Sequence, residues 1–247
     1  NLILEGKKEL VQGLKIPCIN DVQLIPEIRE FVGQIDVFAA GPPCEGNSNL
    51  NNITRRTDHR NNHYVTAAIL AAKLGASIVI IENVQAVKSA RQNVVEQAKL
   101  ILHKAGYSVN NCEHLLKAEN YNVAQKRIRH FLIAVKDNFD EIKLDYNDLK
   151  MNPLSVMDVI GDLLNNKKTD LMNLNSNLSD ENKKRIDYLF DNDLYDLPDT
   201  ERPFCHKEKE HNYPSVYGRM FPNLPSYTLT TGFQSPGRGR YIHPTER

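Results

Sequence analysis

The 247-residue chain has no tryptophan, only four cysteines and no long hydrophobic run. The cysteines, at positions 18, 44, 112 and 205, are far apart and form no Cys-x-x-Cys pair. This spacing argues against a disulfide framework and a structural zinc, and Cys205, His206 and His211 amount to half a ligand set. No stretch reaches the roughly 18 apolar residues of a membrane span, and nothing near Asn1 resembles a signal peptide. We therefore expect a cytoplasmic protein with free thiols, no metal and no membrane partner.

The chain also has no excess of positive or negative charge, because 31 basic side chains balance 31 acidic ones. The distribution is uneven. Residues 137–200 carry 15 acidic and 7 basic side chains, whereas the remainder carries 16 acidic and 24 basic ones. A basic body with an acidic insert is compatible with a phosphate-binding face, although it is as often a solvated surface.

Strand-like and helix-like segments alternate through the first 136 residues. The predicted strands are 16–22, 35–40, 77–81, 107–116 and 130–135, and the predicted helices are 62–74 and 87–105. The near-continuous apolar run at 77–81 is typical of a strand buried on both faces of a parallel sheet. Such alternation predicts an α/β fold with right-handed crossovers.

The composition changes after Lys136. The segment 137–200 is rich in Asn, Asp, Leu and Lys, with helices expected near 153–164 and 180–190, and 203–247 is rich in Pro, Gly and aromatic residues. We expect one domain over 1–136, an insert-containing region over 137–225, and a segment returning to the first domain over 226–247.

Two short motifs follow predicted strands. Gly41-Pro42-Pro43-Cys44-Glu45-Gly46-Asn47-Ser48 comes after the strand at 35–40, and Glu82-Asn83-Val84 comes after the strand at 77–81. Ligands of open α/β sheets sit beyond the carboxyl ends of the strands, so a thiol and a carboxylate are expected there. Burial would favour a proton on Glu82 near neutral pH. Taken singly, Cys44 is more often a small buried residue, and Glu82 is as often a helix cap.

Two further motifs are basic. In Gln125-Lys126-Arg127-Ile128-Arg129, alternation along an extended segment places Arg127 and Arg129 on one face, where their guanidinium groups suit a phosphate or a carbonyl. A solvated strand end would show the same pattern. Thr228-Leu229-Thr230-Thr231, followed by Gly237-Arg238-Gly239-Arg240, is a hydroxyl-rich basic segment suited to a phosphate backbone.

The four motifs, in this order, resemble the cytosine-C5 DNA methyltransferases of bacterial or phage type. Asp58-x-Arg60-Asn61, between the first two, also resembles the family. The resemblance covers nearly the whole chain apart from the acidic insert. It implies a Rossmann-like class I S-adenosylmethionine-dependent methyltransferase sheet with a small, mostly irregular target-recognition region, acting on double-stranded DNA.

The resemblance also implies roles for individual residues. Cys44 would add to C6 of a cytosine flipped out of the duplex, and Glu82 would stand at N3 of the ring. Arg127 and Arg129 would hold the carbonyl of the base and the neighbouring phosphate. The residues implied in cofactor binding are Asp21, Val22 and Pro43. The residues expected to contact DNA are Glu45, Ser48, Arg219, Thr230, Arg238 and Arg240, with Tyr213 and Tyr217 as further candidates for base readout, although a structural role is at least as common for such residues.

The sequence departs from the family in three places. The glycine- and aromatic-rich opening motif that holds the methionine part of the cofactor is absent upstream of Asp21, and the closing motif is absent after Arg247. We therefore expect a fragment, or a second chain that supplies these parts. Asn47 replaces the usual aromatic residue, and the target-recognition region is short.

Two other functions remain open at this point. One is the related class that methylates transfer RNA, which shares the Cys, Glu and Arg set but usually has threonine where this chain has Ser48. The other is a catalytically silent, methyltransferase-like DNA-binding subunit. If the leading interpretation holds, a nucleoid-associated enzyme with a partner restriction endonuclease is expected.

Overall fold

The computed structural model describes residues 23–47, 56–137, 145–165, 177–207 and 215–247. These residues divide into two compact units. Unit 1 holds the described residues up to Leu116 together with those of Ile128–Asp145, and unit 2 holds Lys117–Arg127 and the described residues from Tyr146 onward. None of the described helices is both long and apolar enough to cross a bilayer.

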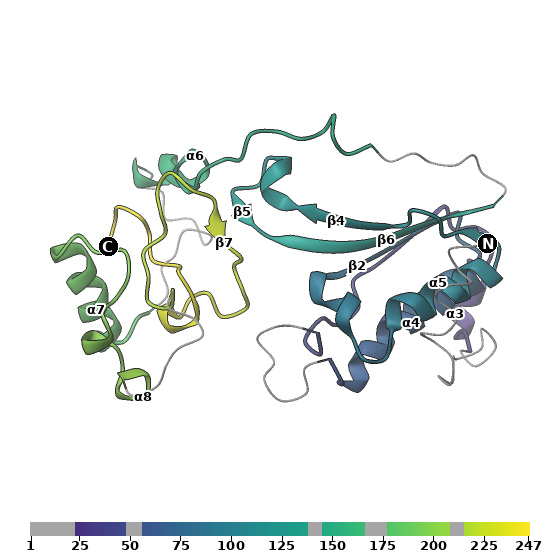
Figure 1. Ribbon diagram of the computed structural model, residues 1–247, viewed down its shortest axis with the longest axis horizontal. Helices are drawn as coiled ribbons and strands as arrows, with labels where there is room; N and C mark the ends of the chain where they lie inside the picture. Colours follow the sequence, from purple (N-terminus) through teal and green to yellow (C-terminus); the bar gives the residue numbers. More distant parts are fainter. Residues whose placement is uncertain (1–22, 48–55, 138–144, 166–176, 208–214) are drawn as a thin grey trace. The chain divides into compact units, whose positions relative to one another are not determined.

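Unit 1 is built around a mixed five-stranded sheet (Figure 1). Its strands run in the order β1-β2-β6-β3, with β4 also paired to β6. β1 pairs with β2 in parallel, and β6 is antiparallel to β2 over seven residue pairs. The strands are β1 (Val37–Ala40), β2 (Ile78–Val84), β3 (Tyr107–Ser108), β4 (Glu113–Lys117) and β6 (Ile128–Lys136).

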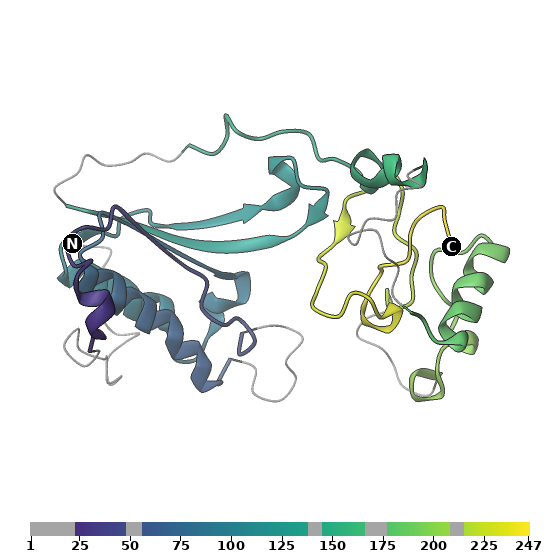
Figure 2. The same ribbon diagram turned by 180° about the vertical axis from the view of Figure 1, so that it is seen from behind.

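Helices cover one face of this sheet (Figures 1 and 2). They are α4 (His63–Leu74) and α5 (Val94–Lys104), with the short α3 (Pro26–Arg29) and the 3-10 turns η2 (His59–Asn62) and η3 (Gln85–Ser89) at their margins. Buried alanines on α4 let the two main helices approach closely. The core between helices and sheet includes Tyr64, Val79, Ile81, Leu102 and Leu132.

The alternation predicted from the sequence is confirmed for the described segments, with corrections. The expectation that the strand at 77–81 is buried on both faces is wrong, because alternate residues of β2 are buried and half-buried. The segment 107–116 forms two strands rather than one. The predicted strand at 16–22 lies outside the described residues.

The single helix expected over 87–105 is also wrong, since η3 and α5 are separated by a turn. Asn93 takes a left-handed conformation with φ of 50°. In the same turn, the N–H of Arg91 donates to the carbonyl of Arg56 at 3.0 Å. This tertiary contact to Arg56, which follows the Pro-Pro-Cys motif along the chain, therefore overrides the helical pattern of the sequence.

Unit 2 has little regular structure. Its helical segments are η4 (Ala118–Tyr121), α6 (Val156–Ile160), η5 (Gly161–Asn165), α7 (Asp180–Asp191), η7 (Asp199–Glu201), α8 (Phe204–Lys207) and η8 (Pro236–Arg238). A two-stranded parallel sheet joins β5 (Gln125–Lys126) to β7 (Ser226–Tyr227). A small core gathers Leu189 of α7 with Leu197, Val216, Tyr217 and Ile242.

Candidate active site

The Pro-Pro-Cys segment lies at the carboxyl end of β1. A turn closes behind the cysteine, because the N–H of Asn47 donates to the carbonyl of Cys44 at 3.0 Å. The N–H of Arg56 donates to the carbonyl of Gly46 at 2.7 Å, so the segment after the turn is tied to it as well. Cys44 is half-buried with a free thiol. Two backbone hydrogen bonds therefore hold the turn that carries the thiol.

Gly46 has no room for a side chain. A Cβ there would lie 2.3 Å from Oδ1 of Asn61 and 2.6 Å from Cβ of Asp58. The Pro-Pro-Cys-x-Gly segment thus packs directly on the Asp-x-Arg-Asn segment, which explains why the two motifs occur together. Asn47, which replaces the usual aromatic residue, is buried, and its Oδ1 finds no hydrogen-bond partner among the described residues.

Arg60 forms ion pairs within its own Asp-x-Arg-Asn segment and with the Pro-Pro-Cys-x-Gly segment. Its guanidinium makes two hydrogen bonds to the Asp58 carboxylate, at 3.0 and 2.8 Å, and an ion pair with Glu45. Asp58 is buried and also accepts the backbone N–H of Arg60 at 2.9 Å. Glu45, expected to contact DNA, here pairs with Arg60, and its DNA contact stays a prediction.

Glu82 stands at the end of β2, next to the strand that leads into the Cys44 loop. The parallel register pairs Ala40 with Ile81, so Gly41, which follows the last residue of β1, lies beside Glu82 of β2. Oε1 of Glu82 forms an ion pair with Nε of Arg129 at 2.8 Å. Oε2 faces the backbone of Gly41, at 3.7 Å from where a Cβ would stand. One carboxylate oxygen is therefore engaged by the arginine and the other is directed toward the start of the Cys44 loop.

Asn83, directly after Glu82, links the first two motifs. It is on the buried face of β2, where its Nδ2 donates to the carbonyl of Pro42 at 3.1 Å. Its Oδ1 accepts the N–H of Val84 at 2.9 Å. The Glu-Asn-Val motif thus supplies a functional carboxylate on one face and an anchor for the Cys44 loop on the other.

Arg127 is separated from Arg129 by the break between β5 and β6. Exposure alternates from Gln125 to Arg129, with Arg127 and Arg129 both half-buried, and the placement of the two arginines on one face stays a prediction. Arg127 belongs to unit 2, where its backbone N–H donates to Oε2 of Glu119 at 3.3 Å. Within that unit the third and fourth motifs meet: Ser226 Oγ donates to the carbonyl of Ala124 at 3.0 Å and Thr228 Oγ1 to that of Lys126 at 2.7 Å.

The residues expected to contact DNA in unit 2 differ in exposure. Arg238 is exposed, and Thr230 bonds the hydroxyl of Tyr241 at 2.9 Å. Arg219 and Arg240 are buried. The Arg219 guanidinium stacks between Phe190 and Tyr195 and donates to the carbonyl of Pro244, whereas that of Arg240 stacks on Phe221 and donates to the carbonyls of Tyr195 and Arg219. These contacts favour a scaffolding role for both arginines, and their DNA contacts stay predictions.

Four predicted site residues lie outside the described residues: Asp21, Val22, Ser48 and Tyr213. Tyr217 is described. It is buried in the core of unit 2, has φ of 60° and stacks with Arg185.

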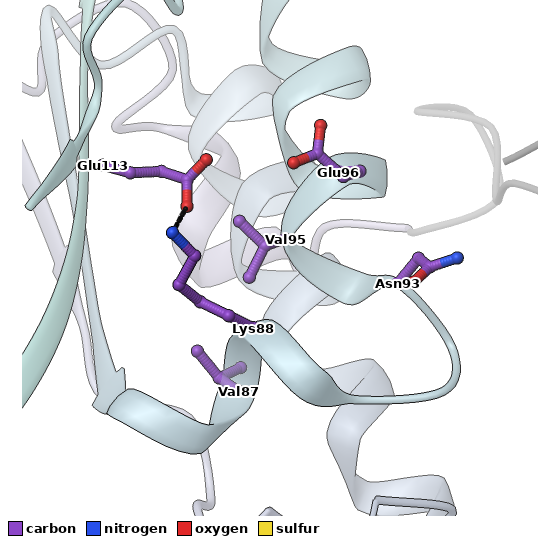
Figure 3. A pocket seen from close by; sticks show the side chains of 6 residues that line it. All are labelled: Val87, Lys88, Asn93, Val95, Glu96 and Glu113. Atoms are coloured by element: carbon purple, nitrogen blue, oxygen red, sulfur yellow. Dashed lines mark ion pairs between the residues drawn. The ribbon is translucent and has the colours of Figure 1, made fainter. Parts of the chain in front are cut away.

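A small hollow lies behind the sheet rather than at the site (Figure 3). It encloses about 40 Å³, enough for water but not for a nucleobase. The residues around it are Val87, Lys88, Asn93, Val95, Glu96 and Glu113.

The sequence motifs assign no role to Asn83, Arg60 or His130. Asn83 and His130 directly follow Glu82 and Arg129, and alternation along a strand would have placed them on the opposite face. The charged triplet Glu45, Asp58 and Arg60 was visible in the sequence, but its pairing depends on the path of the chain.

An α/β sheet that presents a thiol loop, a carboxylate and an arginine at one edge defines a catalytic domain of methyltransferase type. The chain belongs to the C-5 cytosine-specific DNA methylase family, whose sequence profile matches residues 13–235. This assignment confirms the resemblance inferred from the motifs.

Two type II enzymes illustrate the relationship. The chain is 39% identical to the type II methyltransferase M1.BsuMI of Bacillus subtilis over 216 residues, which are 87% of this chain and 50% of the relative. It is 31% identical to the type II methylase M.HgiDII of Herpetosiphon aurantiacus over 72% of this chain and 51% of the relative. The chain thus spans about half the length of these relatives.

Solved structures confirm the class I methyltransferase fold. A DNA modification methyltransferase encoded within an E. coli prophage superimposes with a TM-score of 0.54 at 19% identity, covering 93% of this chain and 70% of the other. The S. pombe Dnmt2 methyltransferase gives 0.50 at 15% identity, covering 91% and 58%.

Proposed function

We propose that the protein is a DNA (cytosine-5-)-methyltransferase. The observation that carries the proposal is the Glu82–Arg129 ion pair at the sheet edge from which the Cys44 loop departs. Membership of the C-5 cytosine methylase family points to cytosine as the base. The thiol, the carboxylate and the guanidinium suit a ring that is attacked at carbon while charge develops on its nitrogen and oxygen atoms.

In the proposed reaction, the Cys44 thiolate forms an Sγ–C6 bond to cytosine. The electron pair of the C5=C6 double bond then becomes available at C5, which takes up the methyl group. Loss of the C5 proton with expulsion of the thiolate restores the ring and the enzyme. Since C6 is inaccessible within a base stack, the cytosine must first be flipped out of the duplex.

Cys44 attacks C6 of the ring, whereas Glu82 and Arg129 would act at its N3 atom and its carbonyl oxygen. Oε2 of Glu82, the oxygen not engaged by Arg129, would hold a proton at N3 as negative charge builds there. Arg129 keeps the carboxylate in place, and its guanidinium would face the carbonyl oxygen of the base. Arg127 and Arg238 would hold phosphates of the target strand.

S-adenosylmethionine supplies the methyl group when bound. The described part of the proposed cofactor site is Pro43, which is exposed at the carboxyl end of β1, where ligands of α/β sheets bind. This placement fits a residue that contacts both the cofactor and the flipped ring. The proposed contacts of Asp21 and Val22 lie outside the described residues.

The proposed partner is double-stranded DNA, and a type II restriction endonuclease is proposed because the relatives carry type II names. We also propose that parts of the cofactor site are supplied by further sequence or by a second chain. In a cell the enzyme would then be found on the nucleoid.

Covalent trapping tests the proposal directly. The complete protein, with S-adenosylmethionine and duplex DNA carrying 5-fluorocytosine, should form an adduct that survives denaturation, because fluorine at C5 blocks the final elimination. The adduct should be absent in Cys44→Ser. An adduct that persists in this variant would disprove the assigned nucleophile.

The same assay separates the alternatives. Trapping by a transfer RNA substrate alone would identify an RNA methyltransferase. DNA binding without trapping on either nucleic acid would identify a catalytically silent subunit.

A further inference from the structure

A charged cluster lies behind the candidate active site, on the covered face of the sheet, where Lys99 and His130 are buried, Glu113 is half-buried and Lys88 is exposed. At its centre is Glu113 of β4, whose carboxylate contacts two lysines and one histidine. Lys99 of α5 contacts Oε1 at 2.9 Å, and Lys88 of η3 contacts Oε2 at 3.1 Å (Figure 3). Nε2 of His130 lies 3.3 Å from Oε2. The cluster therefore connects α5, η3 and β6 through one side chain.

The protonation of the cluster follows from these contacts. The hydrogen bond from His130, followed by those from Lys99 and Lys88, lowers the pKa of Glu113 well below its usual range against the opposing effect of burial. Burial raises the pKa of Tyr64, which keeps its proton and lies 3.5 Å from Nδ1 of His130. An ionised carboxylate accepts only, so His130 donates from Nε2 to Glu113.

The cluster reaches the active site through two neighbouring residues of β6. His130 and Arg129 are consecutive, and their side chains point to opposite faces of the sheet. His130 is fully buried on the helix-covered face, opposite Asn83. Arg129 is on the open face and holds Glu82.

Arg129 is also at the end of the pairing between β2 and β6, whereas β4 pairs with β6 on its other side. The register between β2 and β6 runs from Ile78–Val135 to Val84–Arg129, so Arg129 belongs to its last pair. Ends of strand ladders open more readily than their centres. The His130–Glu113 hydrogen bond anchors the backbone one residue before this end, on the buried side.

We infer that His130 and Glu113 are positioning residues for catalysis, which hold the end of β6 in register so that Arg129 stays on Glu82. The inference rests on the proposed function. Neither side chain faces the site, so each acts through Arg129. An effect of this kind differs from a general loss of stability, because it depends on the presence of the arginine.

A double-mutant cycle in the complete protein tests this dependence. The measurement is the single-turnover methylation rate at saturating DNA and S-adenosylmethionine, corrected for the folded fraction. We expect His130→Leu to lower the rate about tenfold with Arg129 present, and less than about twofold in an Arg129→Gln background. His130→Gln, which keeps an N–H donor near Nε2, should recover most of the rate.

Leu132→Ala provides the matched control. Leu132 is the next residue on the same buried face of β6, it is fully buried, and it takes no part in the cluster. Its replacement should lower the free energy of unfolding but change the rate by the same factor in both backgrounds.

Equal factors for His130→Leu in the two backgrounds would overturn the inference and leave the proposed function intact. A wild-type protein that neither methylates nor traps DNA would overturn the proposed function and the inference with it. If His130→Leu does not fold, the same cycle run with Glu113→Gln decides between these outcomes.

Discussion

The side-chain amide of Asn83 donates a 3.1 Å hydrogen bond to the carbonyl oxygen of Pro42. This contact joins the buried face of β2 to the loop that carries Cys44. Glu82, the preceding residue, is on the open face and holds Arg129. A single Glu-Asn pair therefore fixes the positions of the proposed nucleophile loop and of the group at N3 with respect to the same strand.

Replacing Asn83 by aspartate should impair the loop more than the strand. The introduced carboxylate would keep an acceptor for the N–H of Val84 but would set its second oxygen against the carbonyl of Pro42. We expect a loss of about 1–3 kcal/mol in the free energy of unfolding, because a buried donor is replaced by an unsatisfied charge. Covalent trapping of 5-fluorocytosine DNA should slow as well.

The exposed Asn110 supplies the control. Asn110→Asp changes the same functional group in unit 1 but should alter neither the denaturation midpoint nor the trapping rate. Normal trapping by Asn83→Asp would show that the contact with Pro42 does not hold the nucleophile loop.

A methyl group at position 46 should disrupt the same loop from the other side. Gly46→Ala places Cβ within 2.6 Å of both Asn61 Oδ1 and Asp58 Cβ, so the loop or the Asp-x-Arg-Asn segment must shift. Overpacking of this kind costs about 1–3 kcal/mol. Denaturant unfolding measures the loss, and Gly161→Ala should be neutral, since only Met157 Cε, at 3.6 Å, lies near that position.

Glu82→Gln tests the group assigned to N3. The amide retains the shape of the side chain but cannot carry the proton, so methylation should slow by about 10²–10⁴-fold. DNA affinity should change little, because the ring is held by other contacts as well. An unchanged single-turnover rate would remove Glu82 from this role.

Much of unit 1 could be predicted because the sequence patterns that specify its strands and helices are local. The apolar run before Glu82 indicates a strand, and Gly75 ends α4 in the left-handed conformation expected of a helix-terminating glycine. The motif after β1 and the motif at the carboxyl end of β2 meet at one edge because parallel strands place their carboxyl ends together. The family resemblance then assigned chemistry to residues that are ambiguous when taken singly.

The parts that could not be predicted depend on contacts between distant segments. The helix over 87–105 is interrupted because Arg91 bonds the backbone of Arg56, and no pattern within that window records this contact. Arg219 and Arg240 carry the same charge as Arg238, and only the aromatic rings around them show that they are buried. His130 has no motif, and its place follows from the register of β6 on β2.

Arg238 and Arg219 should therefore respond differently to substitution. Removing the more accessible Arg238 should weaken DNA binding and reduce the slope of log K against log salt by about one, as expected for one lost phosphate contact. Arg219→Ala removes a stacked guanidinium and leaves the carbonyl of Pro244 without its donor. We expect a loss of about 1–3 kcal/mol in stability with the salt slope unchanged. A reduced slope in a fully folded Arg219→Ala protein would instead establish a phosphate contact.

The loss of unfolding free energy as the pH falls into the acid range should depend on Glu113. Its carboxyl has a lowered pKa in the folded protein, chiefly through His130, against about 4.3 when unfolded. A group whose folded pKa is depressed contributes stability that is present above its unfolded pKa and lost as pH falls toward its folded pKa. Glu113→Gln should thus reduce the free energy of unfolding most at neutral pH. Below about pH 4 the gap from wild type should narrow as the wild-type carboxyl becomes protonated in the unfolded chain.

Urea unfolding between about pH 3 and pH 7 measures this gap, since the window spans the unfolded pKa. The exposed Glu27 provides a control in which the same amide replacement lacks the three partners of Glu113. Its curve should run parallel to wild type. A constant difference between Glu113→Gln and wild type across the range would mean that the substitution acts through shape alone. A difference that narrows in acid would show that the ionised carboxylate, gathering His130, Lys99 and Lys88, stabilises the rear of the sheet that carries Arg129.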